Sequence, residues 1–295
     1  MGTILVILSA LCFGTAGTWI ALIGDTELGT AILTATRLLF MALLSYLFCR
    51  IRKISLKTDR KEFLHFLVFG CFGQGLTLLL YDYAAREMSV GATALCHFTY
   101  PLLVALASSA IDREKIGKMK IIAAVLMLGG LSLTAQGGAV TVKGVAYAFA
   151  SAVTFASYVY ALDHTLLRDT EPLKLTFYNA LLSAILMILF SALTRSLVIP
   201  RQTNVYGLMF CGAVAGVLGN VFLTTGIRYT GATKAAFLSI LEPASAFVWD
   251  VVIFGTRLGI VAVIGILMTF LSFFAVLMDR PSGKTGDIAY EREET

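Results

Sequence analysis

Charge is scarce in this sequence, because Asp, Glu, Lys and Arg together make up only 14% of its 295 residues. So few charged groups cannot cover the surface of a water-soluble domain of this length, and that class of protein is excluded. Histidine occurs three times, and the five cysteines form no Cys-x-x-Cys pair. Neither a zinc site nor a disulfide framework is therefore predicted, and we expect no metal and no cofactor.

Catalytic motifs are also missing. The sequence holds no His-Glu-x-x-His, no Gly-x-Ser-x-Gly and no recognisable pair of catalytic aspartates. It shows no ring of like charges or filter segment that would indicate a channel. An enzyme is therefore not predicted, and a membrane-embedded enzyme or a channel is kept as the alternative to the function developed below.

Long apolar runs are abundant instead. Hydrophobic residues make up 58% of the chain, and the mean hydropathy is +0.85. Runs of about 20 apolar residues without period-two alternation predict membrane-spanning helices, not barrel strands. We expect an all-α polytopic membrane protein whose ten spans lie at about 3–24, 30–49, 64–85, 91–110, 119–136, 143–163, 173–193, 205–226, 232–254 and 259–278.

Basic residues are unevenly placed between these spans. The loop Arg50–Glu62 alone holds six of them. If that loop is cytoplasmic, alternation puts seventeen of the 23 Lys and Arg inside and five outside. The positive-inside rule then predicts two cytoplasmic termini, in a bacterial plasma (inner) membrane. The basic loop would contact anionic lipid and not nucleic acid, and residues 281–295 are expected to be a disordered cytoplasmic tail.

An internal repeat organises the chain. Pro101 and Pro243 lie 142 positions apart, and Gly70 and Gly212 share this offset without a gap. We therefore expect one five-helix repeat over 1–140 and a second over 141–280. Because each repeat has an odd number of spans, the second must be inverted relative to the first. Inverted repeats are typical of secondary transporters, whose site lies near mid-membrane between the repeats.

These features resemble a known family. Arg37 in the second span, the block GATALCHFTYPLLVALASSAIDREKIG and the block LEPASAFVWDVVIFGTRLG are similar to EamA-like permeases of the drug/metabolite transporter superfamily. The resemblance implies ten spans in two repeats and secondary transport of small metabolites, often amino acids, through a central cavity. The acid usual at the closing turn is kept as Glu114, but Thr256 replaces it in the second block. We expect a monomer or weak homo-oligomer.

Arg37 is a candidate pathway residue, because a charge within a span is costly unless it has a cavity or a partner. It either lines the pathway or pairs with Asp82 or Asp250. Its repeat mate is Asn179, so the two repeats differ chemically at this position.

Glu242 lies near the centre of the ninth span, on a stripe with Ser239 and Asp250. Pro243 cannot donate to the carbonyl of Ser239, so we expect that carbonyl to be free for water or substrate. An acid placed there can bind substrate or a coupling proton; the alternative is a buried packing residue.

His97 is a candidate proton relay or a neutral packing residue. Pro101 and Pro243 are expected to bend their spans, which is what a transporter site at mid-membrane uses. Trp19, Tyr100 and Tyr158 are aromatic candidates for lining one cavity, with helix packing as the alternative for each.

Overall fold

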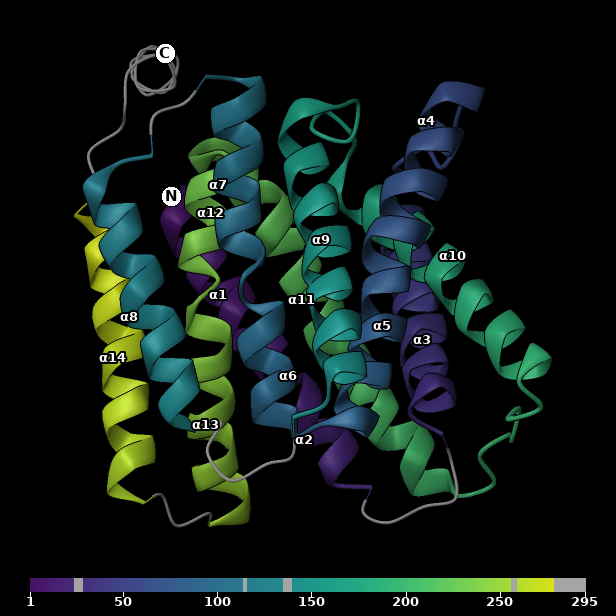
Figure 1. Cartoon of the computed structure of the whole chain (residues 1–295). Helices are drawn as coiled ribbons and strands as arrows, with labels where there is room; N and C mark the ends of the chain where they lie inside the picture. Colours follow the sequence, from purple (N-terminus) through teal and green to yellow (C-terminus); the bar gives the residue numbers. More distant parts are fainter. Residues whose placement is uncertain (24–28, 114–115, 135–139, 256–258, 279–295) are drawn as a thin grey trace.

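The computed structural model describes residues 1–23, 29–113, 116–134, 140–255 and 259–278. All regular secondary structure in these ranges is helical, and the helices lie side by side in one bundle (Figure 1). The elements are α1 (Gly2–Gly14), α2 (Ala16–Ala21), α3 (Thr30–Ile51), α4 (Arg60–His65), the π-helical segment η1 (Phe66–Gly75), α5 (Leu76–Glu87), α6 (Val90–His97), α7 (Tyr100–Ile111), α8 (Lys118–Thr134), α9 (Val142–His164), α10 (Pro172–Leu193), α11 (Thr203–Thr230), α12 (Ala232–Leu238), α13 (Leu241–Phe254) and α14 (Ile260–Leu277).

Eight helical stretches in the described part of the chain are long and apolar enough to cross a membrane. They are Ala31–Ile51, Arg60–Glu87, Val90–Ile111, Val142–His164, Pro172–Leu193, Thr203–Thr230, Ala232–Phe254 and Ile260–Leu277. The all-helical membrane fold is confirmed. The expected first span divides at Thr15 into α1 and α2, and α8 has 17 residues. The total of ten spans therefore stays a prediction.

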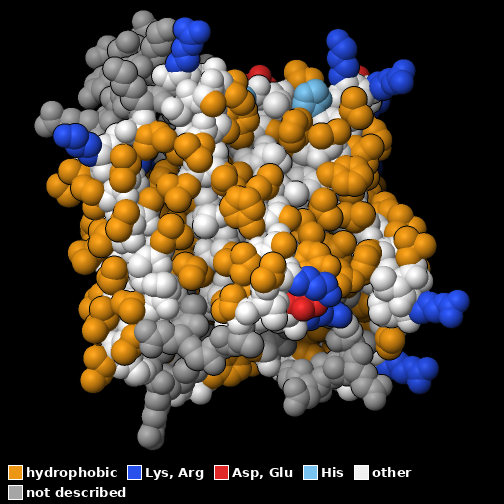
Figure 2. Space-filling model, viewed as in Figure 1, with side chains coloured by type: hydrophobic (Ala, Val, Ile, Leu, Met, Phe, Trp, Pro, Cys, Tyr) orange, Lys and Arg blue, Asp and Glu red, His pale blue; other side chains and the backbone are white. Residues whose placement is uncertain are grey.

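The outside of the bundle is apolar. Figure 2 shows hydrophobic side chains over much of the visible face, with most Lys and Arg near its margins and one group of basic and acidic side chains in its lower part. On α14, Leu267, Leu271 and Phe274 are each more than half exposed. Apolar surface of this extent is unfavourable in water and favourable against lipid chains. The chain is therefore an integral multi-pass membrane protein.

The two ends of the bundle differ in charge. The α3–α4 loop, the α9–α10 connection, the junction of α11 and α12 and the N-terminus all lie at the end drawn at the top of Figure 1. We call it the basic end; the basic residues there include Arg52, Lys57, Arg60, Lys61, Arg168, Lys174, Arg228 and Lys234. The opposite end holds Gly29, the α5–α6 turn and residues 194–202.

Small residues let α8 and α14 approach closely. A Cβ atom added at Gly130 would lie 2.5 Å from the backbone oxygen of Gly265 and 3.0 Å from the backbone nitrogen of Thr269. Close backbone approach through small residues is a common way for helices to pack in lipid. This contact therefore depends on glycine.

Gly130→Ala is expected to lower the stability of the purified protein by about 1–3 kcal/mol, because rigid backbone atoms would have to move apart. Gly207→Ala is the matched control, since a Cβ there meets nothing within 4 Å, and alanine is the better helix former. Thermal unfolding in detergent measures both variants. Equal melting temperatures for the two would contradict the packing argument.

Candidate functional site

Two spans are interrupted in the middle of the bundle. The helix pair α6 and α7 breaks at Phe98 and Thr99, and the pair α12 and α13 breaks at Ser239 and Ile240. Pro101 and Pro243 each lie in the first turn of the second helix of the pair, where proline costs little because its N–H is not needed. Each break exposes helix ends, whose partial charges can act on a ligand.

These helix ends suit the ionisable groups beside them. Glu242 lies in the first turn of α13 and His97 in the last turn of α6. A negative group is favoured at a helix N-terminus and a positive group at a C-terminus. The break in each span therefore places a titratable side chain where the backbone supports its charged form.

The expected free carbonyl at Ser239 is wrong. Its oxygen accepts a hydrogen bond from the backbone N–H of Glu242, at 2.9 Å. The break replaces the lost i→i+4 bond by a tighter i→i+3 turn. Ser239 thus lies in the break itself and not on the face of α13, and its hydroxyl donates to Ala235.

An aromatic cluster surrounds His97. Its ring centroid lies 5.3 Å from that of Tyr81, 5.6 Å from Tyr100 and 5.5 Å from Phe155. Tyr100 and Phe155 meet edge to face at 4.7 Å. The cluster joins α5, α6, α7 and α9, and so brings both halves of the chain to one place.

Glu242 faces this cluster. Its carboxylate interacts electrostatically with the hydroxyl groups of Tyr81 and Tyr100. The residue is half-buried, and among the residues that the structure describes its carboxylate makes neither an ion pair nor a hydrogen bond. If Glu242 served only to pack span 9 against a neighbour, its carboxylate would need a hydrogen-bond partner. If Glu242 binds substrate or a proton, the carboxylate must be available for that ligand.

His97 is held by a defined hydrogen bond. Its Nδ1 lies 2.9 Å from the Oγ of Ser151, and that hydroxyl donates to the backbone oxygen of Ala148 at 2.6 Å. Because a serine has one hydroxyl hydrogen, the imidazole must donate from Nδ1. This leaves Nε2 as the acceptor of a neutral ring, so a proton arriving at His97 would bind there.

Tyr158 and Asn179 continue the polar path at buried positions. The Asn179 amide nitrogen donates to the Tyr158 hydroxyl at 2.9 Å, and the Tyr158 ring lies 6.1 Å from Phe155. The amide oxygen of Asn179 is buried without a hydrogen-bond partner among the described residues. An added Cβ at Gly70 would overlap that oxygen, so the glycine makes room for the amide.

Arg37 lies nearer the opposite end, on α3. Its guanidinium interacts electrostatically with Asp82. An added Cβ at Gly212 would lie 3.1 Å from Trp19 Cδ1 and 3.3 Å from Arg37 Cδ, so Trp19 and Arg37 pack together against α11. Of the two acids considered from sequence, Asp82 acts electrostatically on Arg37, and the Asp250 side chain lies outside the described residues, so pairing with one of the two stays a prediction.

Gln74 and Asn220 form an amide pair that sequence reasoning did not select. Gln74 Nε2 donates to Asn220 Oδ1 at 3.0 Å, and Asn220 Nδ2 donates to the backbone oxygen of Gly216. The pair joins η1 to α11 across the two halves. In the sequence, the two residues stand out only as amides inside long apolar runs. Their spacing does not indicate that they form a hydrogen bond with each other.

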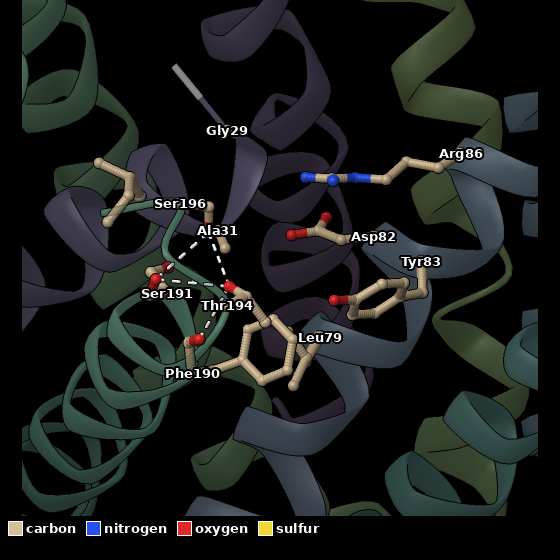
Figure 3. Close-up of a pocket in the computed structure, with 11 residues that line it drawn as sticks. Gly29, Ala31, Leu79, Asp82, Tyr83, Arg86, Phe190, Ser191, Thr194 and Ser196 are labelled. Atoms are coloured by element: carbon tan, nitrogen blue, oxygen red, sulfur yellow. Dashed lines mark hydrogen bonds between the residues drawn. The ribbon is translucent and has the colours of Figure 1, made fainter. Parts of the chain in front are cut away.

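A cavity opens beside Asp82. Its volume is about 210 Å³, and in Figure 3 the side chains of Asp82, Tyr83 and Arg86 project from α5 towards the hydroxyl-bearing segment 191–196. Ser191 is buried, and its hydroxyl has no partner among the described residues. The polar lining suits a small solute that enters from the end of the bundle opposite the basic end.

Asp250 belongs to α13, but its side chain lies outside the described residues, as do Glu114, Thr256 and the expected tail 281–295. The other candidates fall into two neighbouring groups. One consists of His97, Tyr100, Tyr158, Asn179 and Glu242 around the aromatic cluster, and the other of Trp19 and Arg37 beside Asp82.

Comparison with known proteins adds independent information. A sequence model of the EamA-like transporter family matches residues 1–136 and again 142–278. An Archaeoglobus fulgidus protein named "uncharacterized transporter" is 27% identical over 265 residues, covering 90% of this chain and 92% of the relative. Bacillus subtilis "uncharacterized transporter YcbK" is 23% identical and covers 90% and 88%. A solved crystal structure superposes over 100% of this chain and 99% of its own, with a TM-score of 0.80 and 18% identity.

Proposed function

This chain belongs to the EamA-like transporter family, and we propose that it is a secondary transporter of a small organic metabolite. The observation that carries the proposal is Glu242, an acid without an ion-pair partner in the described chain, at a helix break inside a membrane bundle. An intramembrane ionisable group indicates a functional site, and broken helices at mid-membrane are typical of transporter sites.

We propose alternating access between two inverted repeats, and mirrored contacts support this symmetry. Gly70 packs against Asn179, and Gly212 packs against Arg37. Gly70 and Gly212 are 142 positions apart, as are Arg37 and Asn179. Exchanging the two halves therefore exchanges one contact for the other, as a two-fold axis between them requires.

Contacts made by the N-terminal glycine of each repeat are also related by the offset of 142. An added Cβ at Gly2 would lie 2.5 Å from Tyr229 Cβ, and one at Gly144 would lie 3.2 Å from Glu87 Cβ. Both pairs of positions, 2 with 144 and 87 with 229, differ by 142. Contacts related in this way at separate places favour a symmetric fold over a chance likeness of apolar runs.

Helix packing repeats the pattern on a larger scale. The helix α1 packs on α11, and α9 packs on η1 and α5; the remaining contacts include α3 on α10 and α8 on α14. In the last pair, Gly130 approaches Gly265 while Ser272 donates to the backbone oxygen of Ala123 at 2.7 Å. These two contacts are again mirror images at an offset of 142.

The substrate class follows from the side chains at the site. Arg37 provides a guanidinium, which suits a carboxylate, and the aromatic cluster provides apolar walls. We infer a small organic solute with a carboxylate, such as an amino acid, with a proton as coupling ion at Glu242 or His97. Membrane lipid is the surrounding partner.

We further propose that the basic end faces the cytoplasm of a bacterial cell, following the positive-inside rule. Reporter fusions at Lys57 should be active only as cytoplasmic reporters, and those at Lys143 and Arg201 only as external ones. Activity of the external reporter at Lys57 would reverse the proposed orientation.

Flux measurement in proteoliposomes tests the proposed function against the two alternatives. A transporter gives saturable uptake of a carboxylate solute that is recovered chemically unchanged. Recovery of a covalently altered solute would identify an enzyme instead. Uptake that rises linearly with concentration, without competition between solutes, would identify a channel.

A further inference from the structure

A mostly buried ion pair joins the two halves of the chain at the basic end. Lys174 Nζ lies 2.7 Å from Glu62 Oε2, and the two side chains are 11% and 19% exposed. The same ammonium donates to the backbone oxygen of Lys57 at 2.7 Å. Lys174 is in the first turn of α10, whereas Lys57 and Glu62 belong to the first half.

Further hydrogen bonds surround this ion pair. The Tyr178 hydroxyl donates to the backbone oxygen of Leu56 at 2.7 Å, and its ring stacks on Phe66 at 4.6 Å. Thr170 donates to the other Glu62 oxygen at 3.4 Å and accepts at its backbone oxygen from Arg228. Segment 56–62 is thus joined directly to α10 and, through Thr170, to α11.

The proposed repeat symmetry identifies the equivalent place at the opposite end. Subtracting 142 from 174 and 178 gives Ile32 and Thr36, and adding 142 to 56 and 57 gives Val198 and Ile199. All four line a single cavity of about 460 Å³. The symmetry mates of a closed, ion-paired cluster therefore line an open and largely apolar space.

No ion pair can form at the mirrored positions. The mate of Lys174 is Ile32, and the mate of Glu62, at 62 plus 142, is Asn204. The Asn204 side chain accepts from its neighbour Val205 instead. If the two repeats were identical in sequence, the same contacts would stabilise closure at both ends. The ion pair occurs only at the basic end, so closure there is favoured.

We propose that Glu62, Lys174, Tyr178 and the backbone oxygens of Leu56 and Lys57 form a latch. It holds the protein closed at the basic end and open at the opposite end, and it must break once in each transport cycle. This inference rests on the proposed function. It also assigns a mechanical role to the basic loop, beyond membrane topology.

Cys71 is a native probe for this latch. It is 6% exposed, and its Sγ lies 3.7 Å from the backbone oxygen of Leu182, between η1 and α10. Release of the latch separates these two helices and uncovers the thiol. The experiment uses the full chain in proteoliposomes, with the other cysteines (Cys12, Cys49, Cys96 and Cys211) replaced by alanine.

A membrane-impermeant maleimide is added on the side of the basic end, and the rate of Cys71 labelling is measured. Glu62→Gln should raise this rate about tenfold or more. The labelling rate follows the population of the conformation in which the latch is open, and loss of the ion pair should raise that population by a similar factor. The control is Glu87→Gln, because Glu87 pairs with Lys143 at 2.8 Å in an exposed pair at the opposite end. That variant should label at the wild-type rate.

Exchange of the two charges, Glu62→Lys with Lys174→Glu, should return labelling towards the wild-type rate. If Glu62→Gln does not fold, Tyr178→Phe removes a neutral hydrogen bond of the same latch and should give a smaller rise. Unchanged labelling in a folded variant, or an equal rise in Glu87→Gln, would overturn the latch and identify a fixed structural contact. Labelling does not depend on flux, so loss of the proposed function would be recognised separately.

Discussion

Replacing Glu242 with Gln is expected to reduce transport at least about 100-fold if the acid binds the coupling proton, because an amide keeps the size and hydrogen bonds but cannot ionise. The carboxylate faces Tyr81 and Tyr100 at the start of α13, where the helix end favours a negative charge. Any residual flux should no longer respond to pH between about 5 and 8.

The measurement is initial uptake into proteoliposomes across that pH range, with thermal stability recorded for each variant. Glu87→Gln is the control, since its acid pairs with the exposed Lys143 at the opposite end, and it should transport normally. Wild-type flux with an intact pH response in Glu242→Gln would disprove the functional role. Loss of thermal stability with unchanged residual flux would favour helix packing.

Arg37→Gln is expected to weaken substrate binding by about 10- to 100-fold, because a charge-assisted hydrogen bond contributes roughly 1.5–3 kcal/mol. The effect should appear mainly in KM for carboxylate solutes. Arg201→Gln is the matched control, because Arg201 is exposed at the opposite end, and its KM should equal that of the wild type.

A second variant separates substrate binding from internal pairing. If Arg37 serves only to neutralise Asp82, then Arg37→Gln combined with Asp82→Asn should restore the wild-type KM, since the unpaired charge is gone. If Arg37 binds the substrate, the double variant should bind as weakly as Arg37→Gln. Restoration by the double variant would remove Arg37 from the proposed pathway.

The helical membrane fold was accessible from sequence because apolar runs of about 20 residues have one stable form in lipid. Both spans break beside Pro101 and Pro243, and the equivalence of the two prolines at an offset of 142 stays a prediction. Span number was less accessible, because no proline in the sequence marks the break at Thr15.

Side-chain partners were largely beyond sequence reasoning. Arg37, His97 and Glu242 stand out because charged or titratable residues are costly in apolar runs, but nothing in their spacing identifies Tyr81 or Phe155 as neighbours. The expectation of a free Ser239 carbonyl holds only for proline in a continuous helix, whereas this span is broken at Ser239 and Ile240. Lys174 lies at the start of the expected span 173–193, and nothing in the sequence indicates that it is buried and paired with Glu62.

Counterflow in proteoliposomes tests alternating access at a single site most directly. Vesicles loaded with excess unlabelled carboxylate solute should transiently accumulate labelled solute from outside, without any ion gradient, because one site exchanges between two faces. Glu62→Gln should keep this exchange, whereas Arg37→Gln should need about 10- to 100-fold more solute to reach it. Labelled solute that only equilibrates, without a transient excess, would contradict the account.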